Sequence, residues 1–226
     1  EVTALTAERL SVLRAPLPPV DQVDLPSPEA TPFSLPDIPL DIRIDQVAIA
    51  RVDLGEPLLG QEASLSLDGQ ARLADIELRR TDGPAGRFSL MAGFDNATRV
   101  LDIDLTLAEA PDGLAATLLN IPGTPDLRLE VAGEGPLDDI LVDISLATDG
   151  QDRVTGSVRS AQIADGAGQR IDVDLSGDLT PLMAAECHPF FGTDSALTAT
   201  VEQNTDGATT LRDLRLASAA LDLSGD

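Results

Sequence analysis

The sequence predicts an all-β fold, a long antiparallel meander with one aliphatic face. Aliphatic and polar residues alternate along much of the chain, as in LDIDLTL at 101–107. The alternation returns at 40–44, 127–131, 171–175 and 221–223, with almost no helical periodicity between these segments. A period of two sends successive side chains to opposite faces of a strand. The resulting aliphatic face needs a second sheet, a layer of helices or an apolar ligand to bury it.

The chain begins with a loosely alternating segment at 1–14, and a proline-rich segment follows at about 14–39. Eight of the 16 prolines lie in that second segment. Proline fixes φ and lacks a backbone donor, so we expect an extended loop there rather than a central strand. The main run of strands begins at about Leu40. We expect residues 1–226 to be a segment of one elongated domain, cut from a longer protein.

Six Asp-Gly pairs punctuate the strand-like sequence, and this dipeptide suits the positive φ angles of tight hairpin turns. They lie at 68–69, 82–83, 112–113, 149–150, 165–166 and 206–207. The pairs and the alternation together predict strands near 41–54, 58–68, 71–80, 86–95, 99–107, 126–133, 139–148, 152–160, 169–179, 195–203 and 209–223. Strands that are neighbours in sequence should be neighbours in the sheet.

Two segments interrupt the strand pattern and predict short helices. The first covers 112–119, with Asp112 as its N-cap, and the second covers 180–186, with Thr180 as N-cap and Pro181 at the first helical position. Both have apolar faces that would suit them to cap an end of the sheet.

The composition argues against nucleic-acid binding. The net charge is −24, from 39 acidic and 15 basic residues, and every basic residue is an arginine scattered among acids. Such a chain repels phosphate backbones. Most acids occupy the polar phase of the strands, where we expect a solvated outer face. Calcium binding would instead need oxygen ligands that converge in a loop, and no EF-hand pattern is present.

Nothing in the sequence indicates an enzyme, a cofactor or a metal site. The single cysteine, Cys187, directly precedes the single histidine, His188, and adjacent residues rarely form a nucleophile and base pair. No nucleophile elbow, phosphate loop or dinucleotide motif is found. Acid pairs such as Asp102 with Asp104 and Asp138 with Asp139 are indistinguishable from solvated residues. No apolar stretch approaches the roughly 18 to 20 residues needed to cross a bilayer.

Several segments, in order, resemble the TamB family, the inner-membrane subunit of the translocation and assembly module, which belongs to the AsmA-like bridge-like lipid transfer proteins. The likeness lies at LPDIPLDIRID (35–45), DGLAATLLNIPGTPDL (112–127), VAGEGPLDDI (131–140) and SGDLTPLMAAECHPFFG (176–192). The opening LTAERLSVLRAPLPP (5–19) is also similar to the strand and proline-rich turn that follow the anchor in such proteins.

This resemblance implies an open half-pipe, or β-taco, with an aliphatic concave face. It implies a periplasmic segment of an inner-membrane-anchored protein of a Gram-negative bacterium, on the N-terminal side. Its function would be to conduct phospholipid between the inner and outer membranes in outer-membrane biogenesis. The outer-membrane barrel partner TamA would be contacted by parts of the parent protein outside this segment.

The residues expected to line the groove are the aliphatic members of the alternating segments. They are Ile42, Ile44, Leu65, Leu67, Ile76, Leu78, Leu101, Ile103, Leu105, Leu127, Leu129, Val131, Ile171, Val173, Leu175, Leu214 and Leu216. The same pattern is compatible with the sealed core of a sandwich. A second functional hypothesis is a β scaffold or chaperone-like platform, whose exposed strand edges pair with nascent outer-membrane strands.

Overall fold

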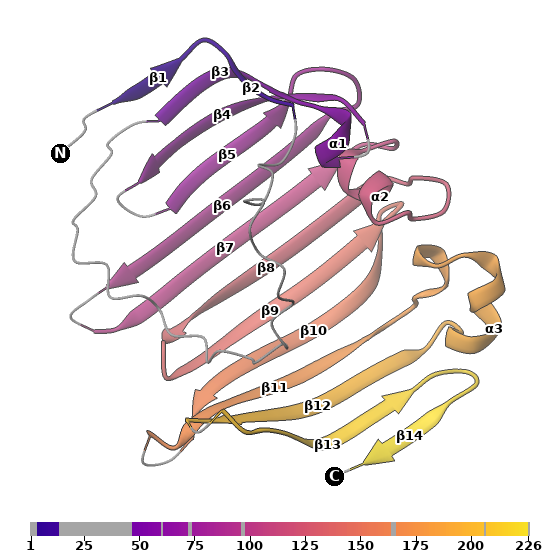
Figure 1. Cartoon of the computed structure of the whole chain (residues 1–226). Coiled ribbons are helices and arrows are strands. Elements are labelled where there is room, and N and C mark those ends of the chain that lie inside the picture. Colours follow the sequence, from indigo (N-terminus) through magenta and orange to yellow (C-terminus); the bar gives the residue numbers. More distant parts are fainter. Residues whose placement is uncertain are drawn as a thin grey trace, which may run out of the picture.

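The computed structural model describes residues 4–13, 47–59, 61–71, 74–95, 98–163, 166–205 and 207–225. These residues form one open sheet of fourteen strands, arranged almost in chain order (Figure 1). The order begins β1-β3-β4 and continues consecutively to β14, and β2 also pairs with β3. The predicted all-β meander, with sequence neighbours adjacent in the sheet, is therefore confirmed from β3 onward.

Most strands lie within a few residues of the predicted segments. They are β1 (Leu5–Ala7), β2 (Leu10–Val12), β3 (Val47–Leu54), β4 (Ala63–Ala71), β5 (Ala74–Arg80), β6 (Gly86–Asp95), β7 (Val100–Glu109), β8 (Leu127–Pro136), β9 (Asp139–Thr148), β10 (Gln151–Gln162), β11 (Gly168–Gly177), β12 (Ser195–Asn204), β13 (Thr209–Ala217) and β14 (Asp222–Gly225). The proline-rich loop predicted at about 14–39 and the first residues of the strand predicted at 41–54 lie outside the described residues.

The first two strands do not follow the predicted antiparallel pattern. Both β1 and β2 pair with β3 in parallel, with Leu5 opposite Val47 and Leu10 opposite Val52. Parallel neighbours need a connection of a dozen or more residues, whereas a hairpin needs only about two. The long sequence between β2 and β3 meets that requirement, so the connection length permits the parallel pairing.

Asp82-Gly83 and Asp149-Gly150 lie in turns between antiparallel strands, as predicted. Gly166 and Gly207 also lie between antiparallel strands with positive φ, and the aspartates that precede them lie outside the described residues. The β9–β10 turn is the tightest, with φ of 53° at Asp149 and 69° at Gly150. Two positive φ values in succession are the geometry of a two-residue hairpin turn. The prediction is wrong at Asp68-Gly69, which lies inside β4, whereas Asp112-Gly113 precedes a helix in the segment predicted to be helical.

The last predicted strand, 209–223, is two strands. A turn after β13 reverses the chain, because the Ser218 N–H donates to the Leu221 carbonyl (2.8 Å) and the Leu221 N–H donates to the Ser218 hydroxyl (3.2 Å). The strand predicted from 58 begins at Ala63 instead, since a short helix, α1 (Glu56–Leu59), occupies the first positions.

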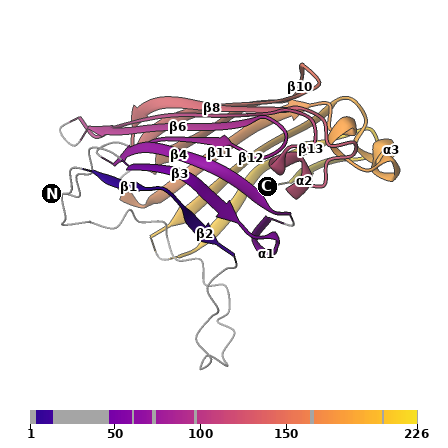
Figure 2. The same cartoon turned by 90° about the horizontal axis from the view of Figure 1, so that it is seen from above.

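Both predicted helical segments are present, and the helices gather at one end of the strands (Figures 1 and 2). The first is α2 (Leu114–Leu118). The second is a chain of short turns, η2 (Thr180–Leu182), η3 (Ala185–Cys187) and α3 (His188–Phe191). With α1, they occupy three connections at the same end of the sheet.

The predicted N-caps are wrong in both helical segments. Asp112 has a left-handed φ of 61°, and Glu109 replaces it by accepting a hydrogen bond from the Ala115 N–H (2.8 Å). In the second segment, Asp178 accepts a hydrogen bond from the Thr180 N–H (3.0 Å). Glu109 is the last residue of β7, and Asp178 directly follows β11. Both hydrogen bonds therefore fix the start of a helical segment to the end of the preceding strand.

Irregularities in three strands interrupt the regular register. Shifts occur between Ile49 and Val52 in β3, at Arg153 in β10 and opposite Ala199 in β13. A bulge bends its strand and increases the local twist. In β10, Gly156 adds a second irregularity, with φ of 155°, and a Cβ on it would lie 1.9 Å from the Asp174 carbonyl oxygen of β11. The β10 backbone therefore approaches β11 more closely than a side chain allows.

A polar network joins the first strands on the face opposite the aliphatic one. Asp53 of β3 accepts hydrogen bonds from the Ser64 hydroxyl of β4 (2.7 Å) and from Arg51 (2.7 Å), and Arg9 donates to it from the β1–β2 connection (2.6 Å). The bonds from Ser64, Arg51 and Arg9 lower the pKa of Asp53 from 3.8 to about 2. Ionised Asp53 thus fastens β1 and β2 to the sheet.

We expect this attachment to be lost in acid. Because the pKa of Asp53 is lower in the folded state, ionised Asp53 stabilises the fold fully above pH 3.8. This stabilisation disappears as the pH falls towards about 2. The urea midpoint of the wild type should fall more steeply across this window than that of Asp53→Asn. Parallel pH profiles for the two proteins would contradict the role given to Asp53.

We also expect Gly156→Ala to destabilise the sheet by about 2–4 kcal/mol, because the backbone is strained for a side chain and the new Cβ clashes with β11. The matched control is Gly225→Ala in β14, where no atom lies within 4 Å of an added Cβ. That control should stay within about 0.5 kcal/mol of the wild type in urea unfolding. Equal effects would exclude the close approach as the cause.

Candidate functional site

The strand register gathers the aliphatic side chains on one face of the sheet. Residues directly opposite each other on neighbouring strands share a face. Apolar residues meet apolar residues from strand to strand in this way, for example Leu90 with Leu105, Leu105 with Val131, and Val131 with Ile144. We call this surface, which runs from β1 to β14, the aliphatic face.

All predicted lining residues that the structure describes lie on the aliphatic face. They are Leu65, Leu67, Ile76, Leu78, Leu101, Ile103, Leu105, Leu127, Leu129, Val131, Ile171, Val173, Leu175, Leu214 and Leu216. Ile42 and Ile44 lie outside the described residues.

Sequence reasoning predicted lining residues on only some strands of this face. The structure adds apolar residues from β3, β6, β9, β10 and β12, among them Ile49, Phe88, Leu90, Val142, Ile144, Leu146, Val158 and Leu197. The same alternation in residues 140–146 would have found the β9 members.

Over most of its length the aliphatic face has no second layer of described residues on it. The strands form a single sheet and pack chiefly against their sheet neighbours. Its central side chains, such as Ile103, Leu105 and Val131, are partly exposed. Fully buried members are few in the described part of the chain, with Val52 at 8%, Leu127 at 2% and Ile140 at 7% exposed. A sealed sandwich core would bury most of them.

The helix end of the aliphatic face is covered. Ala116 of α2 and Ile121 behind it are buried against Leu127, and this cluster rests on Leu107, Leu129, Leu146 and Leu182. The Ile121 N–H donates to the Ala116 carbonyl (2.9 Å), which closes the chain over the strands. The predicted capping of one sheet end by the first helix is confirmed.

A pocket of about 200 Å³ lies beside this cap, between β4, β5, β6 and β7. Its apolar wall consists of Leu65, Leu78, Phe88, Leu107 and Leu114. Arg80, Arg87, Gly86 and Glu109 complete the lining. Arg80 is exceptional on this face, because its side chain is only 8% exposed.

The opposite face carries the charges. Arg159 donates two hydrogen bonds to Asp139, each 2.7 Å long, and they hold the pKa of Asp139 below its ordinary value. Similar pairs join Arg212 to Glu202 at 2.7 Å. The acids are thus dispersed along the strands, some of them paired with arginine, and the described residues contain no group of three or more metal-ligating side chains.

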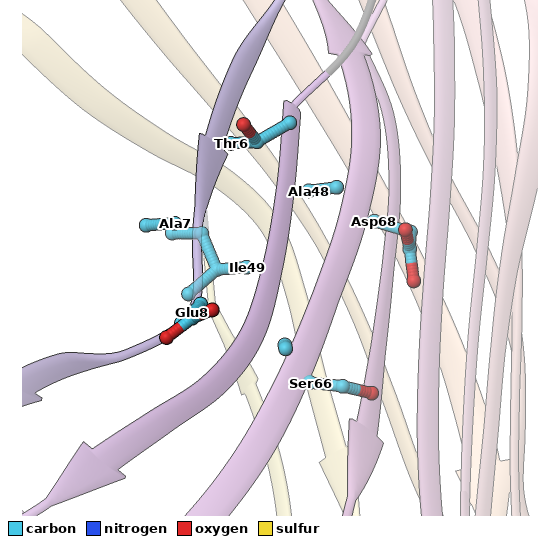
Figure 3. A pocket seen from close by; sticks show the side chains of 8 residues that line it. Thr6, Ala7, Glu8, Ala48, Ile49, Ser66 and Asp68 are labelled. Carbon is cyan, nitrogen blue, oxygen red and sulfur yellow. The ribbon is translucent and has the colours of Figure 1, made fainter.

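A larger pocket, of about 480 Å³, lies at the sheet edge between β1, β3 and β4. Figure 3 shows its two acids, Glu8 and Asp68, on opposite sides of the opening, with small residues such as Ala48 between them. Because the carboxylates do not converge, this pocket lacks the grouping that a cation or a reaction would require.

The Cys187-His188 pair lies at the junction of η3 and α3. His188 Nε2 lies 3.0 Å from the Met183 carbonyl oxygen, so the ring is engaged with the backbone of its own loop. Within the described ranges, no helix is both long and apolar enough to span a bilayer.

No protein-family model, curated protein or solved structure matches this chain. The description of the fold and of the aliphatic face therefore rests on the structure of this chain.

We expect the aliphatic face to accept a charge where it is open and to reject one where it is capped. Ile103→Asp, whose cross-strand neighbours Ala92 and Gly133 are small, should cost about 1–3 kcal/mol. Leu127→Asp, beneath α2, should cost more than about 4 kcal/mol because the carboxylate has no access to water. Urea unfolding measures both. If Ile103→Asp unfolds the protein as readily as Leu127→Asp, the face is sealed.

Proposed function

We propose that the aliphatic face binds the acyl chains of phospholipids and conducts them along the sheet. The observation that supports this is the continuity of the face across fourteen strands together with its lack of cover in the described residues. An exposed apolar surface of this extent calls for an apolar partner. Each buried CH₂ of an acyl chain contributes about 0.8 kcal/mol.

Dimensions support a conduit rather than a pocket for one lipid. Fourteen strands at about 4.8 Å spacing extend for about 60 Å, whereas one acyl chain spans about 15 Å, half of a bilayer core. Leucine, isoleucine and valine make up most of the lining. A bound chain can therefore shift by one strand and keep similar contacts, which favours sliding.

The sheet in this proposal curls into an open half-pipe with the aliphatic face on the inside. The bulges in β3, β10 and β13 supply bending. Glycines on the aliphatic face, including Gly133 and Gly156, reduce crowding on an inner surface. Figure 2 supports this shape, since β2 and β3 at one end of the sheet lie lower in the view than β6 and β8 at its middle.

The cellular setting in this proposal comes from the resemblance to the TamB family. The segment would lie in the periplasm of a Gram-negative bacterium as part of an inner-membrane-anchored protein. It would serve phospholipid transport and outer-membrane biogenesis without enzymatic chemistry or a cofactor, and a TamA-type barrel would meet other parts of the parent protein.

One observation favours the scaffold hypothesis. β14 is exposed throughout and pairs only with β13 among the described strands, so its outer side is a candidate for strand addition. Ser224→Pro should then reduce binding of a nascent outer-membrane strand without reducing bound lipid. The conduit predicts the reverse ranking, with face variants affecting lipid and edge variants leaving it unchanged.

Native mass spectrometry with lipid extraction tests the conduit directly. The protein purified from a Gram-negative host should carry phospholipid, and Ile103→Asp should lose at least about fivefold of it, because a charge on the face opposes apolar burial. The control is Ala108→Asp, an exposed outward position of the same strand between Arg87 and Arg128, which should retain the lipid. A lipid-free wild type that also takes up none from vesicles would contradict the proposal.

A further inference from the structure

Arg80 lies on the aliphatic face instead of the charged one. It ends β5, and the register sets it opposite Leu65, on the same side as Leu78. Its side chain is 8% exposed, whereas the outward arginines Arg79 and Arg87 are 60% and 61% exposed. A guanidinium is thus held against apolar side chains, which is costly unless its donors are satisfied.

The hydrogen bonds of Arg80 leave part of the guanidinium without a partner. Nε donates to the Asp82 carbonyl (2.8 Å) and to its carboxylate (3.2 Å). Nη1 is buried and finds no acceptor among the described residues. Arg153, the other mostly buried arginine of an ion pair, differs: its Nε donates to the Thr148 hydroxyl (2.8 Å), and its Nη1 lies 3.8 Å from Asp178.

The pocket beside Arg80 suits an acceptor that carries apolar chains. It is walled by Leu65, Leu78 and Phe88 and opens on the aliphatic face. A guanidinium in such surroundings bonds phosphate oxygens strongly, because the bond is charge-assisted and water does not compete for it. The carboxylates of Asp82 and Glu109 lie near the same place and oppose a second negative charge. A monoanionic phosphodiester therefore fits better than a phosphomonoester.

We infer that Arg80 binds the phosphodiester of a glycerophospholipid whose acyl chains lie on the aliphatic face. This inference rests on the proposed function and adds a fixed point to it. The headgroup is held at the helix end, next to the α2 cap, while the chains extend over the neighbouring strands. The buried, unpartnered Nη1 is the donor that the lipid satisfies.

Calorimetry with short-chain soluble lipids separates the headgroup from the chains. The delipidated full chain is titrated with dihexanoyl phosphatidylethanolamine and with dihexanoylglycerol, which has the same acyl chains and no phosphate. The wild type should bind the phospholipid at least about tenfold more tightly, since a charge-assisted hydrogen bond contributes that much. Arg80→Gln should remove this difference and leave diacylglycerol binding unchanged.

The matched control is Arg87→Gln: Arg87 belongs to the lining of the same pocket, but its side chain is directed to the outer face, where it is exposed and paired with Glu77 at 2.9 Å. It should keep the preference within about twofold, because an exposed ion pair contributes little. Arg80→Met should match or exceed the wild type in urea midpoint while losing the preference, since removing a buried unpaired donor relieves its desolvation.

The outcomes distinguish the anchor from the conduit. Binding of both lipids with equal affinity by the wild type, or a preference that survives in Arg80→Gln, overturns the anchor and leaves the aliphatic face as an acyl-chain site. Binding of neither lipid overturns the proposed function and the anchor with it.

Discussion

The structure depends on one constraint: the strands place most of their aliphatic side chains on the same face, and that face must be kept from water. Register enforces this, because a slip of one residue would turn a whole strand's aliphatic residues to the solvent side. The acids and arginines then fall on the other face, where pairs such as Arg159 with Asp139 are solvated. The two-residue alternation of the sequence therefore produces both the charged, solvated face and the apolar face.

The aliphatic face is covered at the helix end of the sheet and uncovered over the middle. At the helix end, α2 and the residues after it cover Leu127, and Glu109 fixes the start of that helix. Over the middle, partly exposed side chains such as Ile103 and Leu105 remain without a protein layer in the described part of the chain. The uncovered middle supports the proposal that this surface binds an apolar ligand.

Much of this arrangement was predictable from the sequence. Alternation identified most strands and the face of every described lining residue, since period two fixes side-chain direction, and Asp149-Gly150 identified its hairpin. The parallel β1 and β2 were not predictable, because the same alternation fits either pairing direction. The reversal at Ser218 depends on a local side-chain hydrogen bond that propensity does not reveal. The face on which Arg80 lies was predictable, because Arg80 follows Ile76 and Leu78 in the two-residue alternation. The adjacent Arg79 hides this alternation, since two successive arginines suggest a polar strand end.

The most direct test of the account is cysteine labelling on the two faces of β7. In a Cys187→Ala background, Ile103→Cys on the aliphatic face and Ala108→Cys on the outer face are labelled with an environment-sensitive fluorophore, and phospholipid vesicles are added. The account predicts that both positions label in the folded protein and that emission shifts to the blue only at 103. Labelling at 103 only after unfolding, or equal shifts at both positions, would contradict an open face that binds acyl chains.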